Sequence, residues 1–181
     1  MPRRRRRGQG RGRALLSATA LALALAAPPA QAETDDPAFL VAGFGVFDVN
    51  DEHRTGEARL EFRSGWRFLM FKPFLGMLGN DDGALYGYAG VLVDLYWGRR
   101  IVTTLSFAPG AYHRGSSKDL GATLEFRSQI EFAYRFADRS RLGLAYGHLS
   151  NAGIGDDNPG TESLILSYAL PLDGLFAPAR R

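Results

Sequence analysis

Three residues that together can catalyse acyl hydrolysis lie near the end of the sequence. His148 and Ser150 are two positions apart, and Glu162 follows twelve residues after the serine. In a strand, residues i and i+2 share a face about 7 Å apart at Cα, within reach of an imidazole and a hydroxyl. We therefore expect Ser150 to attack an acyl carbonyl, His148 to take its proton, and Glu162 to orient and stabilise the imidazolium.

Two predicted strands, 141–150 and 162–172, must position these side chains. His148 and Ser150 share the face of the first strand that carries its large apolar residues, and Glu162 shares the corresponding face of the second. Pairing His148 with Glu162 across the hairpin also aligns the apolar pairs Tyr146 with Leu164 and Leu144 with Leu166. Directly opposed Cβ atoms are about 4.5–5.5 Å apart, so the register permits a triad.

Alternation with a period of two residues runs through most of the chain, which predicts strands throughout. In the 15-residue stretch 122–136, even positions are mainly apolar or aromatic and odd positions are mainly charged or polar. Either a soluble sandwich or a membrane barrel shows this pattern. The length of the stretch and the aromatic residues near strand ends favour the barrel, because membrane strands are long and end in aromatic girdles.

The predicted fold is all-β, an eight-stranded antiparallel transmembrane β-barrel of the outer membrane. Eight is the smallest even number of strands in single-chain barrels of this kind. We expect strands at 39–49, 57–64, 68–78, 84–97, 101–112, 122–136, 141–150 and 162–172. Gly65, Pro73 and Gly76 interrupt the second and third of these segments, and a proline in a strand prefers edges or bulges.

Short and long connections alternate along the predicted barrel. Short turns of such barrels face the periplasm and long loops face outward, so the loop at 151–161 is expected to be extracellular. The small side of each of the last two strands then faces a narrow lumen, and the large apolar side faces lipid. An inward row of Glu125, Arg127, Glu131 and Arg135 predicts an ion-pair network that fills the lumen.

The N-terminal stretch has the pattern of a cleaved signal peptide, residues 1–32, followed by one barrel domain, residues 33–181. Seven arginines precede an apolar run that ends in an A-x-A site at Ala32. The arginine run is therefore interpreted as a targeting signal, and no nucleic-acid partner is expected. With no cysteine in the chain, the barrel must close without disulfides.

The segment from His148 to Glu162 resembles the lipid A 3-O-deacylases, an eight-stranded outer-membrane family. The runs that carry the resemblance are His-Leu-Ser-Asn-Ala-Gly from His148 and Asn-Pro-Gly-Thr-Glu from Asn158. The resemblance implies a triad of His148, Ser150 and Glu162. It also implies an oxyanion held with help from Asn158 and Gly153, and Asn151 adds a further amide beside the nucleophile.

The resemblance also implies the reaction and the partners. The enzyme would be a serine esterase that removes the 3-hydroxyacyl chain at the 3 position of lipid A, with lipopolysaccharide as substrate, outer-membrane lipid around it, and no cofactor or metal. A homodimer remains open. One departure is the C-terminus, where the usual final aromatic is absent and Phe176 is the nearest substitute.

Two other functions remain as alternatives. Outer-membrane phospholipases also have a histidine and a serine two apart, but they are larger, calcium-dependent barrels with an asparagine where Glu162 stands. The other alternative is a structural barrel without activity, for which Ser150→Ala should have no effect. His53 and His113 lie in or beside loops and are expected to be solvated, and Trp66 and Trp97 are expected to anchor the membrane interface.

Overall fold

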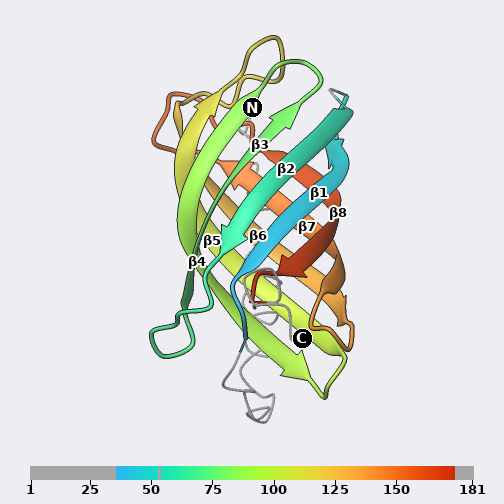
Figure 1. Cartoon of the computed structure of the whole chain (residues 1–181). Coiled ribbons are helices and arrows are strands. Elements are labelled where there is room, and N and C mark those ends of the chain that lie inside the picture. The colour runs from blue at the N-terminus through green and yellow to red at the C-terminus, as the bar shows by residue number, and fades with distance from the viewer. Residues whose placement is uncertain (1–35, 53, 174–181) are drawn as a thin grey trace, which may run out of the picture. The chain divides into compact units, whose positions relative to one another are not determined.

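Eight antiparallel strands form one closed barrel in sequence order in a computed structural model that describes residues 36–52 and 54–173 (Figure 1). The strands are β1 (Phe39–Phe47), β2 (Thr55–Arg63), β3 (Lys72–Asn80), β4 (Leu85–Trp97), β5 (Ile101–His113), β6 (Leu124–Arg135), β7 (Arg141–Ser150) and β8 (Thr161–Pro171). The barrel closes where β1 pairs with β8. The predicted fold class and strand number are confirmed.

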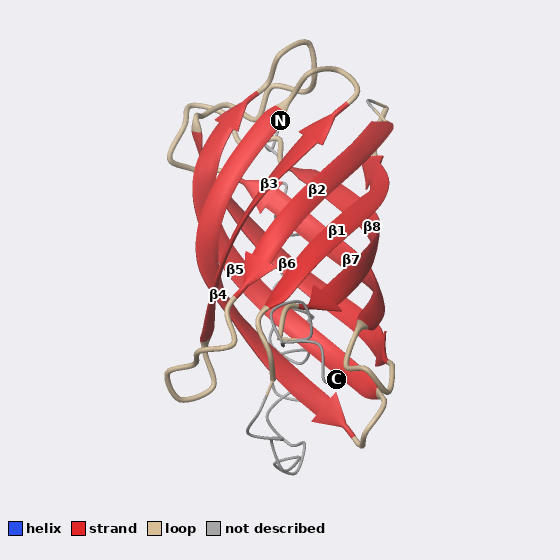
Figure 2. Ribbon diagram, in the orientation of Figure 1, coloured by secondary structure: helices blue, strands red, loops and turns tan. Residues whose placement is uncertain are grey.

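The third strand is the largest departure from the predicted boundaries. It begins at Lys72 rather than at residue 68, because Phe68 and Phe71 close a tight turn instead of continuing a strand. The backbone N–H of each donates to the carbonyl of the other, at 2.9 and 3.0 Å, and Leu69 between them has a φ of 57°. Figure 2 shows this connection as a loop that projects from the wall.

Burial alternates along the strands as the sequence pattern predicts. In β7, residues 142, 144, 146 and 148 are exposed, while the residues between them are buried. The inward row of β6 is also buried, apart from the half-buried Arg135 at its end. The large apolar side chains therefore cover the outside of the barrel, and many charged ones fill its interior.

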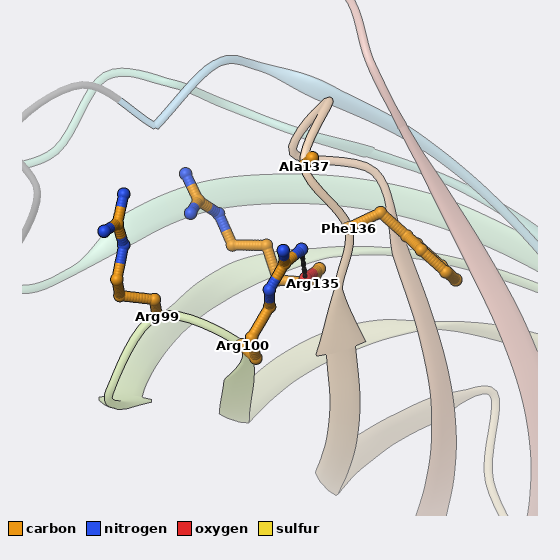
Figure 3. A pocket seen from close by; sticks show the side chains of 5 residues that line it. All are labelled: Arg99, Arg100, Arg135, Phe136 and Ala137. Atoms are coloured by element: carbon orange, nitrogen blue, oxygen red, sulfur yellow. Dashed lines mark hydrogen bonds between the residues drawn. The ribbon is translucent and has the colours of Figure 1, made fainter.

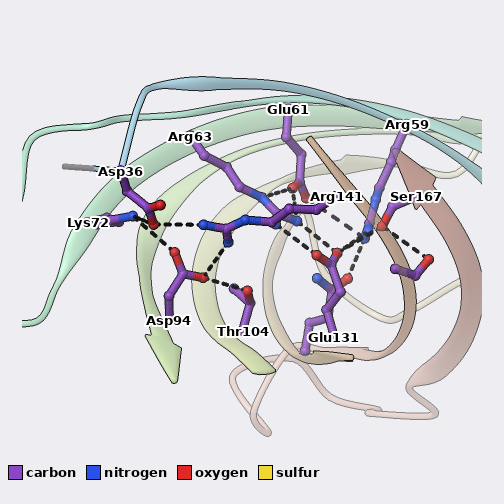
Figure 4. Close-up of polar contacts among 12 residues, drawn as sticks. Asp36, Arg59, Glu61, Arg63, Lys72, Asp94, Thr104, Glu131, Arg141 and Ser167 are labelled. Carbon is purple, nitrogen blue, oxygen red and sulfur yellow. Dashed lines mark hydrogen bonds and ion pairs between the residues drawn. The ribbon is translucent and has the colours of Figure 1, made fainter. Parts of the chain in front are cut away.

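The interior holds two groups of ion pairs (Figure 4). In the middle, Arg63 contacts Glu61 and Glu131, each at 2.9 Å. Towards one end, Asp36 accepts hydrogen bonds from Lys72 Nζ at 2.8 Å and Arg141 Nη2 at 2.7 Å. These contacts show that a charged network fills much of the described lumen, as expected for a narrow barrel.

The two ends of the barrel differ in their connections. The loop rim comprises the connections at 48–54, 81–84, 114–123 and 151–160, and the turn rim comprises those at 64–71, 98–100 and 136–140. Both ends of the described chain also lie at the turn rim, where Leu172 N donates to Ala38 O at 2.8 Å. The predicted signal peptide, His53 and Phe176 lie outside the described residues.

No helix among the described residues is long and apolar enough to cross a membrane.

Candidate active site

The β7–β8 hairpin places His148 directly opposite Glu162, in the register expected from the sequence. His148 Nδ1 lies 3.0 Å from Glu162 Oε1, and both side chains are on the outer surface near the loop rim. A carboxylate only accepts hydrogen bonds, so this contact requires the proton on Nδ1. The lone pair of neutral His148 is then on Nε2, where it can act as a base.

Ser150 lies two residues further along the same outward face of β7 and is half-buried. Its Cα partner on β6 is Phe126, and the Cα partner of His148 is Ser128. Within the described residues, no hydrogen bond joins Ser150 to His148. The structure thus brings two of the three predicted residues into contact and places the third beside them, as is common before a substrate is bound.

Asn151 is a brace for the loop that follows the serine. It is fully buried, and its Nδ2 donates to Leu120 O at 2.9 Å and to Asp157 O at 2.7 Å. Its Oδ1 accepts from Gly153 N at 2.8 Å. Both amide hydrogens are engaged, so the side chain of Asn151 supports the loop and has no hydrogen left for an oxyanion.

In Asn158, the amide oxygen is the side-chain atom that is engaged. Its Oδ1 accepts a hydrogen bond from Asn151 N at 3.0 Å, and no hydrogen bond among the described residues engages its Nδ2. Gly153, by contrast, already donates its N–H to Asn151. Of the predicted oxyanion donors, Asn158 is therefore the one whose donor group this network leaves available.

Gly160 borders the candidate site, and the sequence patterns alone do not single it out. Its φ is 64°, and a Cβ built on it would lie 3.0 Å from His148 Cε1 and 3.6 Å from His148 Nε2. The backbone at Gly160 therefore borders the imidazole closely. The only signal in the sequence is a glycine two residues before the acid, in the motif already quoted.

A second feature that the sequence does not predict is a set of polar contacts at Thr161, the residue before Glu162. Buried Asp48 accepts from Thr161 Oγ1 at 2.8 Å and from Lys118 Nζ at 2.7 Å, and Lys118 also donates to Asp51 at 2.9 Å. Partial burial opposes the charged ammonium, but these hydrogen bonds raise the pKa of Lys118 above its ordinary value. We call Asp48, Lys118 and Thr161 the loop clasp, because they join two loop-rim connections to the first residue of β8.

The clasp acts close to the acid. Thr161 is the neighbour of Glu162 in sequence, and Val49 N donates to Glu162 O at 3.0 Å. Outside the barrel, Asn50 Nδ2 donates to Tyr146 OH at 2.8 Å, two residues before His148 on the same face. The connection between β1 and β2 therefore fixes both the backbone of Glu162 and the surface beside the histidine.

A metal site does not emerge from the described residues, which contain no group of three or more His, Cys, Asp or Glu side chains placed to hold an ion. The candidate site contains a base paired with a carboxylate, a nearby hydroxyl and an amide donor. That set matches the parts needed for acyl transfer.

Comparisons with known sequences point to one family. A family model described as lipid A 3-O-deacylase (PagL) matches residues 75–171, more than half of the chain. The lipid A deacylase PagL of Bordetella bronchiseptica is 26% identical over 117 residues, which are 60% of this chain and 66% of the relative. That of Pseudomonas aeruginosa is 36% identical over 105 residues, 52% of this chain and 58% of the relative. The matches cover less than two thirds of either relative's length.

Comparisons with solved structures agree on the fold. The crystal structure of the outer membrane enzyme PagL superposes with a TM-score of 0.58 at 20% identity, over 74% of this chain and 99% of that one. A barrel from the de novo design of transmembrane β-barrels gives a TM-score of 0.53 at 12% identity, over 74% and 95%. At these identities, the likeness supports the architecture alone.

Proposed function

The chain belongs to the lipid A 3-O-deacylase (PagL) family, and from this premise we propose that it hydrolyses the ester of the 3-hydroxyacyl chain at the 3 position of lipid A. The barrel lies in the bacterial outer membrane. The observation that carries the proposal is the contact between His148 and Glu162 on the outward face, two residues from Ser150. Ionisable groups are costly on a face that meets lipid, and where they occur they usually serve a function.

We assign the steps of the reaction to these side chains. Ser150 Oγ attacks the ester carbonyl while His148 Nε2 takes its proton, and Glu162 stabilises the imidazolium. The imidazolium then protonates the departing sugar oxygen, which leaves an acyl-serine. Water attacks this acyl-enzyme, again with His148 as base, and releases the fatty acid and the free serine.

The negative oxygen of the tetrahedral intermediate needs donors near Ser150. The Asn158 amide is our first candidate, because its oxygen accepts from Asn151 N and its nitrogen has no hydrogen-bond partner among the described residues. Gly153 N–H can contribute by sharing its hydrogen with Asn151 Oδ1, or by leaving it, when the oxyanion forms. One such donor typically stabilises the transition state by about 3–4 kcal/mol.

The position of the site favours a substrate that arrives sideways from the membrane. Towards the turn rim, the outward faces of β7 and β8 next to the proposed triad carry exposed Leu142, Leu144, Tyr146, Leu164 and Leu166. These side chains suit contact with acyl chains. The triad lies at the loop-rim end of this apolar surface, where the ester groups of an outer-leaflet lipid would meet it.

The direct test is mass spectrometry of lipid A from cells that express the protein or its Ser150→Ala variant. We expect the wild type to remove one ester-linked 3-hydroxyacyl chain and the variant to remove none. Ser128→Ala is the matched control, because Ser128 is also an outward serine beside His148 but on the neighbouring strand. Unchanged lipid A in cells with a correctly inserted wild-type barrel would refute the proposal, and release of phospholipid acyl chains instead would favour the phospholipase alternative.

A further inference from the structure

A basic cavity lies at the turn rim, far along the barrel from His148. Its volume is about 440 Å³, and it is lined by Arg99, Arg100, Arg135, Phe136 and Ala137. Figure 3 shows the three arginine side chains, from the β4–β5 turn and the end of β6, around one open space. The site proposed for acyl hydrolysis uses none of these residues.

Local contacts hold Arg100 in place. Its Nη1 donates to Arg135 O at 3.4 Å, and its guanidinium carbon lies 5.9 Å from the centroid of the Tyr134 ring. In return, Arg135 N donates to Arg100 O at 2.7 Å. The turn and the strand end are thus tied together, so part of the entropy of ordering Arg100 has been lost before any ligand binds.

Two acidic side chains at the turn rim, Asp138 and Asp173, are engaged with residues outside the cavity lining. Asp138 Oδ1 accepts from Ser140 N at 3.1 Å and from Ser140 Oγ at 2.7 Å, and Asp173 pairs with Arg139. Within the described residues, neither Arg99 nor Arg100 has an ion pair with an acid. The cavity therefore carries at least two guanidinium charges that an anion can neutralise.

The cavity lies where lipid headgroups are expected. Trp97 and Tyr134 are exposed on the outer surface at this rim, and such aromatic side chains mark the membrane interface of barrels. Arg99 and Arg100 follow Trp97 after a single glycine, in the turn beyond that girdle. Phe136 and Ala137 give the same cavity an apolar side, so it suits a ligand with both a charged and an apolar part.

We propose that Arg99 and Arg100 bind the phosphate of an anionic glycerophospholipid in the leaflet at the turn rim, with its glycerol end against Phe136 and Ala137. Guanidinium groups bind phosphate oxygens through paired, charge-assisted hydrogen bonds. A zwitterionic lipid fits less well, because its ammonium group would meet the same guanidinium charges. The site rests on the membrane placement of the barrel and is independent of the chemistry at Ser150.

Native mass spectrometry of the full chain in detergent micelles tests this site. The probes are phosphatidylglycerol and phosphatidylcholine with identical acyl chains, each added to the wild type, R99Q/R100Q and R99K/R100K. The matched control is R54Q/R114Q, which removes the same charge from exposed residues at the loop rim. We expect the wild type to prefer phosphatidylglycerol and R99Q/R100Q to lose about tenfold or more of that binding, because the variant loses the charge-assisted hydrogen bonds to the phosphate.

The lysine variant keeps the charge without the paired donors and should bind phosphatidylglycerol at an intermediate level, which separates the contribution of the paired hydrogen bonds from that of the charge. Equal binding of the two lipids by the wild type, or an equal loss in R54Q/R114Q, would overturn the proposal. Inorganic phosphate forms a third arm. If it displaces the lipid completely, the site is one for free phosphate and the assignment to a lipid headgroup is wrong.

Discussion

Gly160 determines how close the backbone can come to the His148 imidazole. An alanine here would place a Cβ 3.0 Å from His148 Cε1 at a φ of 64°, so either the ring or the loop must shift. Because small misplacements of catalytic groups are costly, we expect Gly160→Ala to lower kcat for lipid A deacylation by about tenfold to a hundredfold. Kinetics on purified lipopolysaccharide measure this change.

Gly83→Ala is the control for Gly160→Ala, because it introduces the backbone strain without the steric contact to the imidazole. Gly83 also has a positive φ, 82°, and lies at the same rim, but a Cβ on it would meet nothing within 4 Å. We therefore expect Gly83→Ala and Gly160→Ala to lower the free energy of unfolding by a similar amount, about 1 kcal/mol. Only Gly83→Ala should have an unchanged kcat. Equal kcat losses in the two variants would mean that contact with the imidazole is not what Gly160 controls.

The residues of the proposed triad could be predicted from the sequence, but the roles of the residues around it could not. Strand parity alone places His148, Ser150 and Glu162 on one face, and the hairpin register follows from matching apolar partners. Gly160 and Asn151 act through a loop conformation that alternation does not encode. For Asn151, the sequence indicates an amide near the serine, whereas the structure shows that both of its hydrogens are engaged by backbone carbonyls.

At the scale of elements, the loop clasp links the connections after β1 and β5 to the first residue of β8. Lys118→Met would leave the buried Asp48 without its ammonium partner and loosen the segment that contains Thr161 and Glu162. We expect a kcat about threefold to tenfold lower with little change in KM, because the acid that orients His148 becomes less well positioned. Steady-state kinetics in detergent give both constants.

Arg114→Met is the control for the clasp, since it removes a cation from the same connection. Arg114 pairs with Asp119 at 2.9 Å, but both side chains are more than half exposed, so the pair contributes little. Lys118→Arg should retain part of the activity by keeping the charge. A normal kcat in Lys118→Met would show that the clasp does not position the acid.

The boundaries of the strands show where sequence patterns stop being informative. Long alternating strands such as β6 were predicted closely, because one face is apolar and the other charged along their whole length. The start of β3 was predicted too early, since Phe68, Leu69, Met70 and Phe71 are all exposed and apolar and carry no alternation. A positive φ at Leu69 ends the strand pattern, and propensity alone does not reveal it.

For the whole molecule, the charged lumen makes stability depend on pH. Asp36, just before β1, accepts hydrogen bonds from Lys72, Tyr96 and Arg141. Burial opposes its ionisation, but the charges of Arg141 and Lys72 prevail and hold the pKa of Asp36 below its ordinary value. A carboxyl with a lowered pKa stabilises the fold fully above its ordinary value of about 3.9 and loses that contribution as the pH falls through the folded value.

Asp36→Asn tests this dependence. At neutral pH we expect the variant to be about 1–3 kcal/mol less stable in urea unfolding followed by tryptophan fluorescence, because Arg141 and Lys72 lose a charged acceptor but keep Asp94 at 3.2 and 3.0 Å. Below about pH 4 the difference should shrink, since protonation removes the same charge from the wild type. Asp173→Asn, at the same rim but exposed and paired with Arg139, should change little. A gap between wild type and Asp36→Asn that stays constant from neutral to acidic pH would show that the ionised Asp36 does not hold this end of the lumen together.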